Sequence, residues 1–306
     1  MKKLFHEVAM QPESILREDA ITLLRELRLD HFRYVQDWPD DWFNQVQSIL
    51  KITNSKDNFK KLAMLEKLRS SIIKTRGTNH HSSINENKKW RELVSSMGRE
   101  NPFDLQIEQK ELICNGNVID LDDYLELSES ELGSLNMPFK TSNDWYKIIQ
   151  PIIMSDNSIA IVDRYFDLGS QHYSKLFIEF IQWLGRSKVS HLRIFIGPKS
   201  ADEIRSNYWK NDFQIFCDQA VSFINLYAPN LRSNIIVSSC QELHLRYFGS
   251  KVCAIELDYG FRLSGSKNYK VTAMRASALH DFKSQFFSQI SGPNYLTSKS
   301  IWPLRK

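Results

Sequence analysis

The sequence predicts an α/β protein: a mixed sheet covered by helices, preceded by an N-terminal mainly helical domain that carries a small hairpin. Two patterns lead to this prediction. From Ser158 onward, short apolar runs typical of buried strands alternate with amphipathic stretches typical of helices. Before that point, most apolar residues recur at helical spacing. The expected domains are residues 1–145 and 155–290, with a boundary between about 135 and 155, and residues 291–306 form a C-terminal tail.

The N-terminal region is expected to contain helices over residues 12–27 and 56–76, where apolar residues recur on one side. In the second helix Phe59 belongs to the apolar stripe, and lysines such as Lys61 lie mostly off it. An Asn-Gly pair between two short apolar runs predicts a β-hairpin near residues 111–119. An aromatic cluster between the helices either stacks bases beside Arg33 or, as we expect, forms a small core: Phe32, Tyr34, Trp38, Trp42 and Phe43.

The second region is expected to form a largely parallel or mixed sheet, because its strands alternate with helices. The tail after it is expected to be loosely attached. The expected strands are residues 158–163, 191–196, 235–237, 252–257 and 271–274, and the expected helices are residues 170–184, 201–227 and 278–290.

The composition is that of a globular protein. Hydrophobic residues make up 42% and aromatic residues 12% of the 306 residues, which is enough for a core. The longest apolar runs are too short to cross a bilayer, and the N-terminus shows no signal peptide, so no transmembrane segment is expected. Four scattered cysteines without a C-x-x-C pair indicate a reducing, cytoplasmic setting and argue against a zinc ribbon. No metal or other cofactor is predicted.

The formal net charge of +4 hides two adjacent blocks of opposite sign. From Lys51 to Arg99 there are twelve Lys and Arg against four Asp and Glu, and from Glu100 to Glu131 there are ten acidic residues against one lysine. The blocks either neutralise each other within one fold or form a basic face for nucleic acid beside an acidic face for a protein partner.

The candidate site follows from the strand order, because working groups gather at the carboxyl ends of strands in such sheets. Asp163 follows the first strand and Asp258 follows the fourth. His244 and Arg246 lie around the third and fourth expected strands, and in strand conformation two residues this far apart point to the same face. An imidazole beside a fixed cation suits chemistry on a phosphate diester, and a carboxylate would fix its tautomer. We therefore expect Asp163 and His244 to meet at one rim of the sheet.

The stretches SIAIVDRYFD, HLRIFIGP and NIIVSS, followed by His-x-Arg and Gly-Ser-x-Asn, resemble one copy of the phospholipase D-like fold over residues 155–290. The signature of that superfamily is H-x-K-x(4)-D followed by G-S-x-N, and two copies build one site through a phosphohistidine. The resemblance implies that His244 is the nucleophile and that Arg246 replaces the phosphate-binding lysine. It also implies a homodimer, and it assigns the G-S-x-N motif to Gly265, Ser266, Lys267 and Asn268.

Two functions from different classes follow. The resemblance and the basic block favour a metal-independent phosphodiesterase, a nuclease acting on nucleic acid in a bacterial defence or mobile-element system. Lys251 stands where the family has its aspartate, which favours instead an inactive adaptor subunit that binds protein, nucleic acid or lipid headgroups. His-x-Arg also occurs at His31 and His191, so only its place in the strand order singles out His244.

Overall fold

A computed structural model of the chain divides it into two compact units, with the division between Gly133 and Ser134. The boundary lies just before the predicted interval, so residues 134–145, assigned from the sequence to the first domain, belong to the second unit. The structure describes residues 6–29, 33–37, 41–53, 55–73, 105–108, 112–114, 117–119, 134–198, 208–241, 243–288 and 295–303, together with Leu4 and Glu203.

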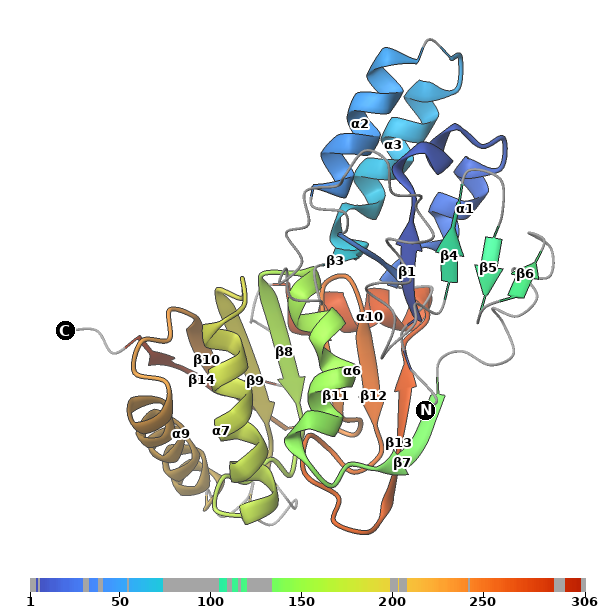
Figure 1. The fold of residues 1–306 in the computed structure, drawn as a ribbon. Helices are drawn as coiled ribbons and strands as arrows, with labels where there is room; N and C mark the ends of the chain where they lie inside the picture. Colours follow the sequence, from blue (N-terminus) through green and yellow to red (C-terminus); the bar gives the residue numbers. More distant parts are fainter. Residues whose placement is uncertain are drawn as a thin grey trace. The chain divides into compact units, whose positions relative to one another are not determined.

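Among the described residues, the first unit holds a six-stranded sheet in the order β3-β2-β1-β4-β5-β6 (Figure 1). The first four strands in this order are mutually parallel, and β5 and β6 form the predicted hairpin, with Cys114 opposite Asn117. The strands are β1 (His6–Met10), β2 (Arg33–Gln36), β3 (Ile72–Ile73), β4 (Leu105–Ile107), β5 (Leu112–Cys114) and β6 (Asn117–Ile119).

Helical residues outnumber strand residues in the described part of this unit, as the prediction of a mainly helical domain requires. The parallel part of the sheet was not predicted, because apolar runs such as Val8–Met10 are too short to show a strand period. The helices are η1 (Pro12–Leu16), α1 (Ala20–Glu26), α2 (Trp42–Ile52), α3 (Asn58–Leu68) and η3 (Arg69–Ser71).

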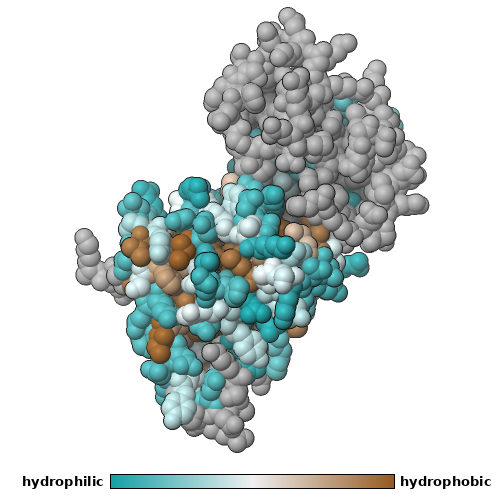
Figure 2. Space-filling model, turned by 60° about the horizontal axis from the view of Figure 1, so that its bottom comes forward, coloured by the Kyte–Doolittle hydropathy of each residue, from teal (hydrophilic) through white to brown (hydrophobic). Residues whose placement is uncertain are grey.

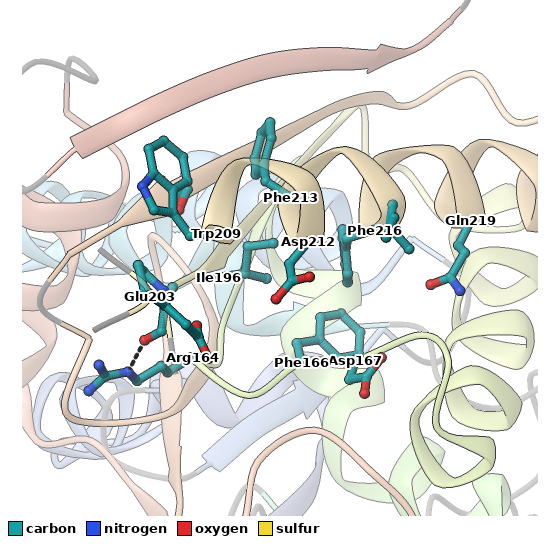
Figure 3. Close-up of a pocket in the computed structure, with 14 residues that line it drawn as sticks. Arg164, Phe166, Asp167, Ile196, Glu203, Trp209, Asp212, Phe213, Phe216 and Gln219 are labelled. Atoms are coloured by element: carbon teal, nitrogen blue, oxygen red, sulfur yellow. Dashed lines mark hydrogen bonds between the residues drawn. The ribbon is translucent and has the colours of Figure 1, made fainter. Parts of the chain in front are cut away.

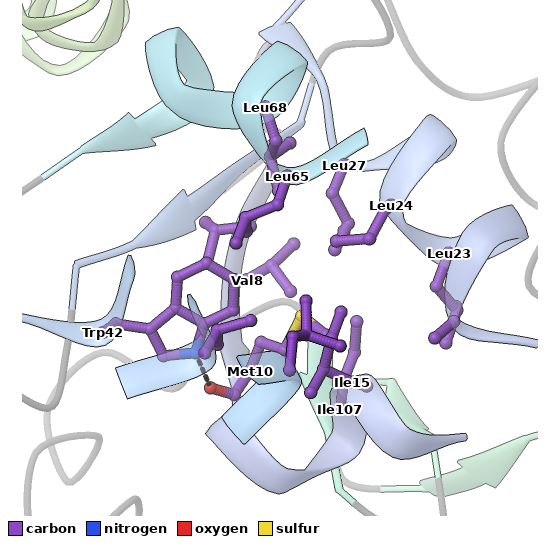
Figure 4. Packing of buried hydrophobic residues seen from close by; sticks show 14 of the residues in the cluster. Val8, Met10, Ile15, Leu23, Leu24, Leu27, Trp42, Leu65, Leu68 and Ile107 are labelled. Carbon is purple, nitrogen blue, oxygen red and sulfur yellow. Dashed lines mark hydrogen bonds between the residues drawn. The ribbon is translucent and has the colours of Figure 1, made fainter. Parts of the chain in front are cut away.

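The core of the first unit lies between the sheet and these helices (Figure 4). Val8 and Met10 on β1 pack with leucines of α1 and α3, and Trp42 donates from Nε1 to the carbonyl of Met10 at 2.6 Å. Tyr34 is also buried, so these two aromatic residues belong to the core, as we expected for their cluster. Arg33 has no place beside stacked bases, because it is buried and pairs with Glu26 at 3.3 Å. Phe32 and Trp38 lie outside the described residues.

Helix α3 differs from the prediction in which side chains it buries. Phe59 is 83% exposed, whereas Lys61 is only 7% exposed. The lysine is buried because its Nζ donates to the carbonyls of Ile15 at 2.9 Å and Arg17 at 3.1 Å, at the end of η1. The ammonium group satisfies the carbonyl of Ile15 and shares that of Arg17 with the backbone N–H of Ala20, which donates to it at 3.4 Å. The helix also ends at Leu68, before the predicted end at residue 76.

Replacing Lys61 by methionine is expected to destabilise the first unit by about 1–3 kcal/mol, because the carbonyl of Ile15 loses its donor and that of Arg17 loses one of two. Lys60→Met is the matched control, since the Lys60 side chain is exposed and, among the described residues, forms an ion pair only with Asp57 at 3.5 Å. Urea denaturation of the two variants measures the difference. Equal stability of the two variants would contradict this account of Lys61.

In the described part of the second unit, an eight-stranded mixed sheet has the order β14-β10-β9-β8-β11-β12-β13-β7. Strands β8, β9 and β10 are parallel to one another, and the other neighbouring pairs are antiparallel. The fold is therefore α/β with a mixed sheet covered by helices, as predicted. The strands are β7 (Ser134–Pro138), β8 (Ser158–Val162), β9 (His191–Ile196), β10 (Asn234–Cys240), β11 (Tyr247–Ser250), β12 (Ala254–Leu257), β13 (Asn268–Ala273) and β14 (Tyr295–Trp302).

Helices cover both faces of this sheet: Figure 1 shows α6 (Ser142–Ser155), α7 (Gln171–Gly185) and α9 (Tyr208–Tyr227) on the near face and α10 (Ala276–Phe286) behind it. Phe282 and Phe286 of α10 pack on Ala160 and Val162. Strand β8 is buried along its whole length, as expected for a strand covered on both sides.

The C-terminal tail is the main correction in the second unit. Instead of being loosely attached, residues 295–302 form β14, which pairs antiparallel with β10. Trp302 is buried and donates from Nε1 to the carbonyl of Leu231 at 2.7 Å. The pairing satisfies the outer edge of β10, which would otherwise expose unpaired backbone groups.

Candidate functional site

Several predicted site residues lie at one edge of the eight-stranded sheet, where β8, β9 and β10 end. Asp163 follows β8, and Tyr247 at the start of β11 pairs with Val162 at the end of β8, so Arg246 lies at the same edge. Asp258 follows β12, which runs antiparallel to β11 and also ends there. Figure 2 turns this end of the unit toward the viewer and shows a mainly hydrophilic surface with hydrophobic patches.

Asp163 is fully buried, and four groups contact its carboxylate. Oδ1 accepts from the backbone N–H of Tyr165 at 2.9 Å and lies 3.5 Å from Nε of Arg246. Oδ2 accepts from the Tyr173 hydroxyl at 3.2 Å and from the backbone N–H of Phe261 at 3.3 Å. Burial raises the pKa of Asp163 above its usual value, although the hydrogen bonds and the Arg246 charge act in the opposite direction.

The backbone of Gly260 packs directly against this carboxylate. Its φ is +87°, and a Cβ atom there would lie 2.0 Å from Oδ2 of Asp163 and 3.1 Å from the Tyr173 hydroxyl. Only glycine fits this combination of backbone conformation and space. The glycine therefore lets the chain after β12 fold close enough for Phe261 N–H to reach the carboxylate.

Two guanidinium groups lie around Tyr173. Arg246 donates from Nη1 to the carbonyl of Asp258 and lies over the Tyr165 ring, with 5.1 Å from Cζ to the ring centroid. Arg262 donates from Nε to the Tyr269 hydroxyl at 2.9 Å, and its Cζ lies 5.7 Å from the centre of the Tyr173 ring. Burial and the Asp163 charge raise the pKa of Tyr173, so it stays a neutral hydrogen-bond donor. Arg246 thus lies beside the buried carboxylate of Asp163, and Arg262 lies beside Tyr173, which donates to that carboxylate.

His244 does not join this cluster, contrary to the expected meeting with Asp163. Strand β11 begins at Tyr247, so His244 and Arg246 lie in the segment before it and do not share a strand face. His244 is exposed, and none of the described residues forms a hydrogen bond or ion pair with it. The carboxylate expected to orient the imidazole is occupied by Arg246, Tyr173 and backbone N–H groups.

The Gly-Ser-x-Asn turn lies at the same edge but outside the cluster. Ser266, Lys267 and Asn268 are exposed, and Asn268 begins β13 opposite Pro138. No bond between this turn and Asp163 occurs among the described residues. The turn is positioned instead through Ser264, whose Oγ accepts from the backbone N–H of Phe139 at 2.7 Å.

Sequence reasoning missed Tyr173, Gly260 and Arg262, which the structure adds to the site. The signal for Gly260 and Arg262 was the run Asp258–Arg262 directly after an apolar strand, where side chains reach the carboxyl edge. Tyr173 lies in the predicted helix 170–184, and its ring is buried.

A cavity of about 110 Å³ lies beside this cluster, between α9 and the ends of β8 and β9 (Figure 3). Arg164 lies in its wall and donates from Nε to the carbonyl of Pro198. Among the described lining residues it is the one cation, against the carboxylates of Asp167, Glu203 and Asp212, so the cavity does not suit an anion. No group of three residues able to hold a metal ion occurs in the described part of the chain.

No family model and no curated protein matches the chain. One similar solved structure is that of TrmBL2, an archaeal chromatin protein that shows a novel mode of DNA binding, with 14% identity over 89% of this chain and 96% of that chain. Its TM-score of 0.28 is too low to establish a shared fold, so the interpretation of the site depends only on the geometry of this chain. No described helix has the length and apolar character needed to cross a bilayer.

Proposed function

We propose that the second unit is a phospholipase D-like module that binds the phosphodiester backbone of nucleic acid without cleaving it. The observation that carries the proposal is the pair of guanidinium groups on either partner of one hydrogen bond: Arg246 beside the buried carboxylate of Asp163, and Arg262 beside Tyr173, which donates to it. Guanidinium groups match the planar, bidentate geometry of phosphate oxygens.

The charge at this edge also favours an anion. Lys267 and Lys270 are exposed near the start of β13, and His244 is exposed before β11. On the side of this edge formed by the chain from Asp258 to Lys270, the two arginines and two lysines outnumber Asp163 and Asp258, whereas the cavity carboxylates Asp167, Glu203 and Asp212 lie on the side of α9. A nucleic acid backbone, with regularly spaced phosphates, can contact several of these cations at once.

Binding is favoured over cleavage because the imidazole of His244 lacks a carboxylate partner among the described residues. A nucleophilic or proton-transferring imidazole needs such a partner to hold its tautomer. Lys251, which stands at the position of the family's aspartate, cannot supply one. Its backbone N–H donates to Asp156 at 3.1 Å, which places it at the opposite end of β8 from Asp163.

The test is a salt titration of binding to fluorescent single-stranded and duplex oligonucleotides, followed by anisotropy. Arg262→Gln is expected to weaken binding and to reduce the slope of log affinity against log salt by about 0.7–0.9, the loss of one phosphate contact. Arg186→Gln is the control, because Arg186 is exposed just after α7, at the opposite end of the sheet. An unchanged slope in Arg262→Gln would contradict the proposal.

Gel analysis of the same mixtures checks for cleavage. Intact probe after incubation with the wild type supports a binding module. EDTA-resistant cleavage that is lost in His244→Ala would instead support the predicted nuclease, with His244 as its nucleophile.

A further inference from the structure

The turn between α2 and α3 in the first unit exposes two large apolar side chains. Ile52, the last residue of α2, is 85% exposed, and Phe59, near the start of α3, is 83% exposed. Both values exceed those of the other exposed large hydrophobic residues in the described part of the chain. Isolated exposed apolar residues are common, but these two flank the same connection between two helices, which makes it a candidate contact surface.

Hydrogen bonds hold this turn in one shape. The side-chain amide of Asn58 donates to the carbonyl of Leu50 at 2.7 Å and also to the carbonyl of Thr53. Asn58 itself is buried, and its backbone N–H donates to Ser55 at 3.2 Å. Since Ile52 and Phe59 each adjoin one end of this bridge, the turn presents both side chains from a fixed backbone.

The charge around the two apolar residues is positive. Lys51, Lys56 and Lys60 are exposed on the turn and its flanks. Asp57 is the one acidic residue in the described part of the segment 50–60, and it lies 3.5 Å from Lys60. Lys51 and Lys56 therefore keep their charges without an acidic neighbour in this segment.

We propose that the α2–α3 turn docks on a bilayer that contains anionic phospholipid. Ile52 and Phe59 would enter the acyl boundary, and Lys51, Lys56 and Lys60 would contact the headgroups, as in interfacial membrane anchors. The area that two side chains can bury is far smaller than the roughly 1,200 Å² that a specific protein interface buries. A bilayer needs no complementary partner surface, so it suits this small apolar area better. An aliphatic residue such as Ile52 has no ring to stack on a base, which favours lipid over single-stranded nucleic acid.

The test is sedimentation of the full chain with vesicles of phosphatidylcholine, with and without phosphatidylserine. We expect binding only where phosphatidylserine is present. Ile52→Ser/Phe59→Ser is expected to lower the partition coefficient at least about tenfold through lost apolar burial. Lys51→Gln/Lys56→Gln is expected to lower it about fivefold per lysine at low salt, the effect of one basic residue near an anionic surface.

Tyr208→Ser/Leu226→Ser is the matched control, because these residues of α9 are 71% and 69% exposed and lie in the second unit. It is expected to bind vesicles as the wild type does. Equal sedimentation with both vesicle types, or wild-type binding by Ile52→Ser/Phe59→Ser, overturns the proposal. A loss of oligonucleotide affinity in that variant without any loss of vesicle binding also overturns it and assigns the turn to nucleic acid. Vesicle sedimentation does not depend on the arginine cluster, and the salt titration of Arg262→Gln does not depend on the turn, so the proposed function of the second unit stands or falls separately.

Discussion

Replacing Gly260 by alanine is expected to lower the free energy of unfolding of the second unit by about 3 kcal/mol or more. A φ of +87° is strained for any residue with a Cβ atom, which alone costs about 1–3 kcal/mol. The added Cβ would also lie 2.0 Å from Oδ2 and 2.9 Å from Cγ of Asp163, so the buried carboxylate would have to move. Moving it weakens its contacts with Tyr173 and Phe261. Urea denaturation followed by circular dichroism measures the loss.

Gly265→Ala separates backbone strain from the close contact. Gly265 has a φ of +63°, and nothing lies within 4 Å of a Cβ built there. Its substitution is expected to cost about 1 kcal/mol, the strain of a left-handed backbone without a clash. Equal destabilisation by the two substitutions would show that the contact with Asp163 is unimportant.

Replacing Arg246 by methionine is expected to destabilise the second unit by about 2 kcal/mol at neutral pH. The substitution leaves the buried carboxylate of Asp163 without its cation, and uncompensated buried charges are strongly unfavourable. The expected value lies below that for a fully buried pair, because the Arg246 side chain is 25% exposed and 3.5 Å separates Nε from Oδ1.

The destabilisation caused by Arg246→Met is expected to become smaller as the pH falls. The pKa of Asp163 in the folded protein is raised above 3.8, so the folded state holds this proton more tightly than the unfolded state. Protonation of Asp163 therefore stabilises the folded protein. This stabilisation is fully present below pH 3.8 and is lost as the pH rises through the pKa that Asp163 has in the folded protein. Removing Arg246 raises the pKa of Asp163 in the folded protein further, so the variant continues to lose stability up to a higher pH than the wild type.

A double-mutant cycle with Asp163→Asn isolates this effect from other carboxylates. In the Asp163→Asn background, Arg246→Met is expected to cost less and to show no dependence on pH between acid and neutral conditions. Unfolding free energies of the four proteins across that range provide the measurement. A pH-independent effect of Arg246→Met in the wild-type background would contradict the assigned ion pair.

The elements of the second unit could be predicted from the sequence because they bury apolar residues on a clear period. Strand β9 occupies the predicted residues 191–196, and α7 begins and ends one residue after its predicted limits. Strand β14 was missed because half of its residues are polar, as suits an edge strand, and its partner lies more than fifty residues earlier in the chain.

The site could be predicted only in part. The position of Asp163 followed from strand order, but its partner did not, because hydrogen-bonding side chains separated in sequence are paired by the fold. A start of β11 at His244 rather than Tyr247 would have placed both His244 and Arg246 on one face. A difference of three residues in the start of one strand therefore moves our proposal from an imidazole to two guanidinium groups.

The pairing of β7 with β13 has a consequence for synthesis on the ribosome. Leu135 at the start of the second unit pairs with Val271, so the edge strand must wait unpaired until most of the unit has been translated. Such distant pairing is slow to form and exposes a free strand edge in nascent chains. We therefore expect chains halted before residue 268 to bind chaperones through β7, while the described strands of the first unit, β1 to β6, have all been translated by residue 119.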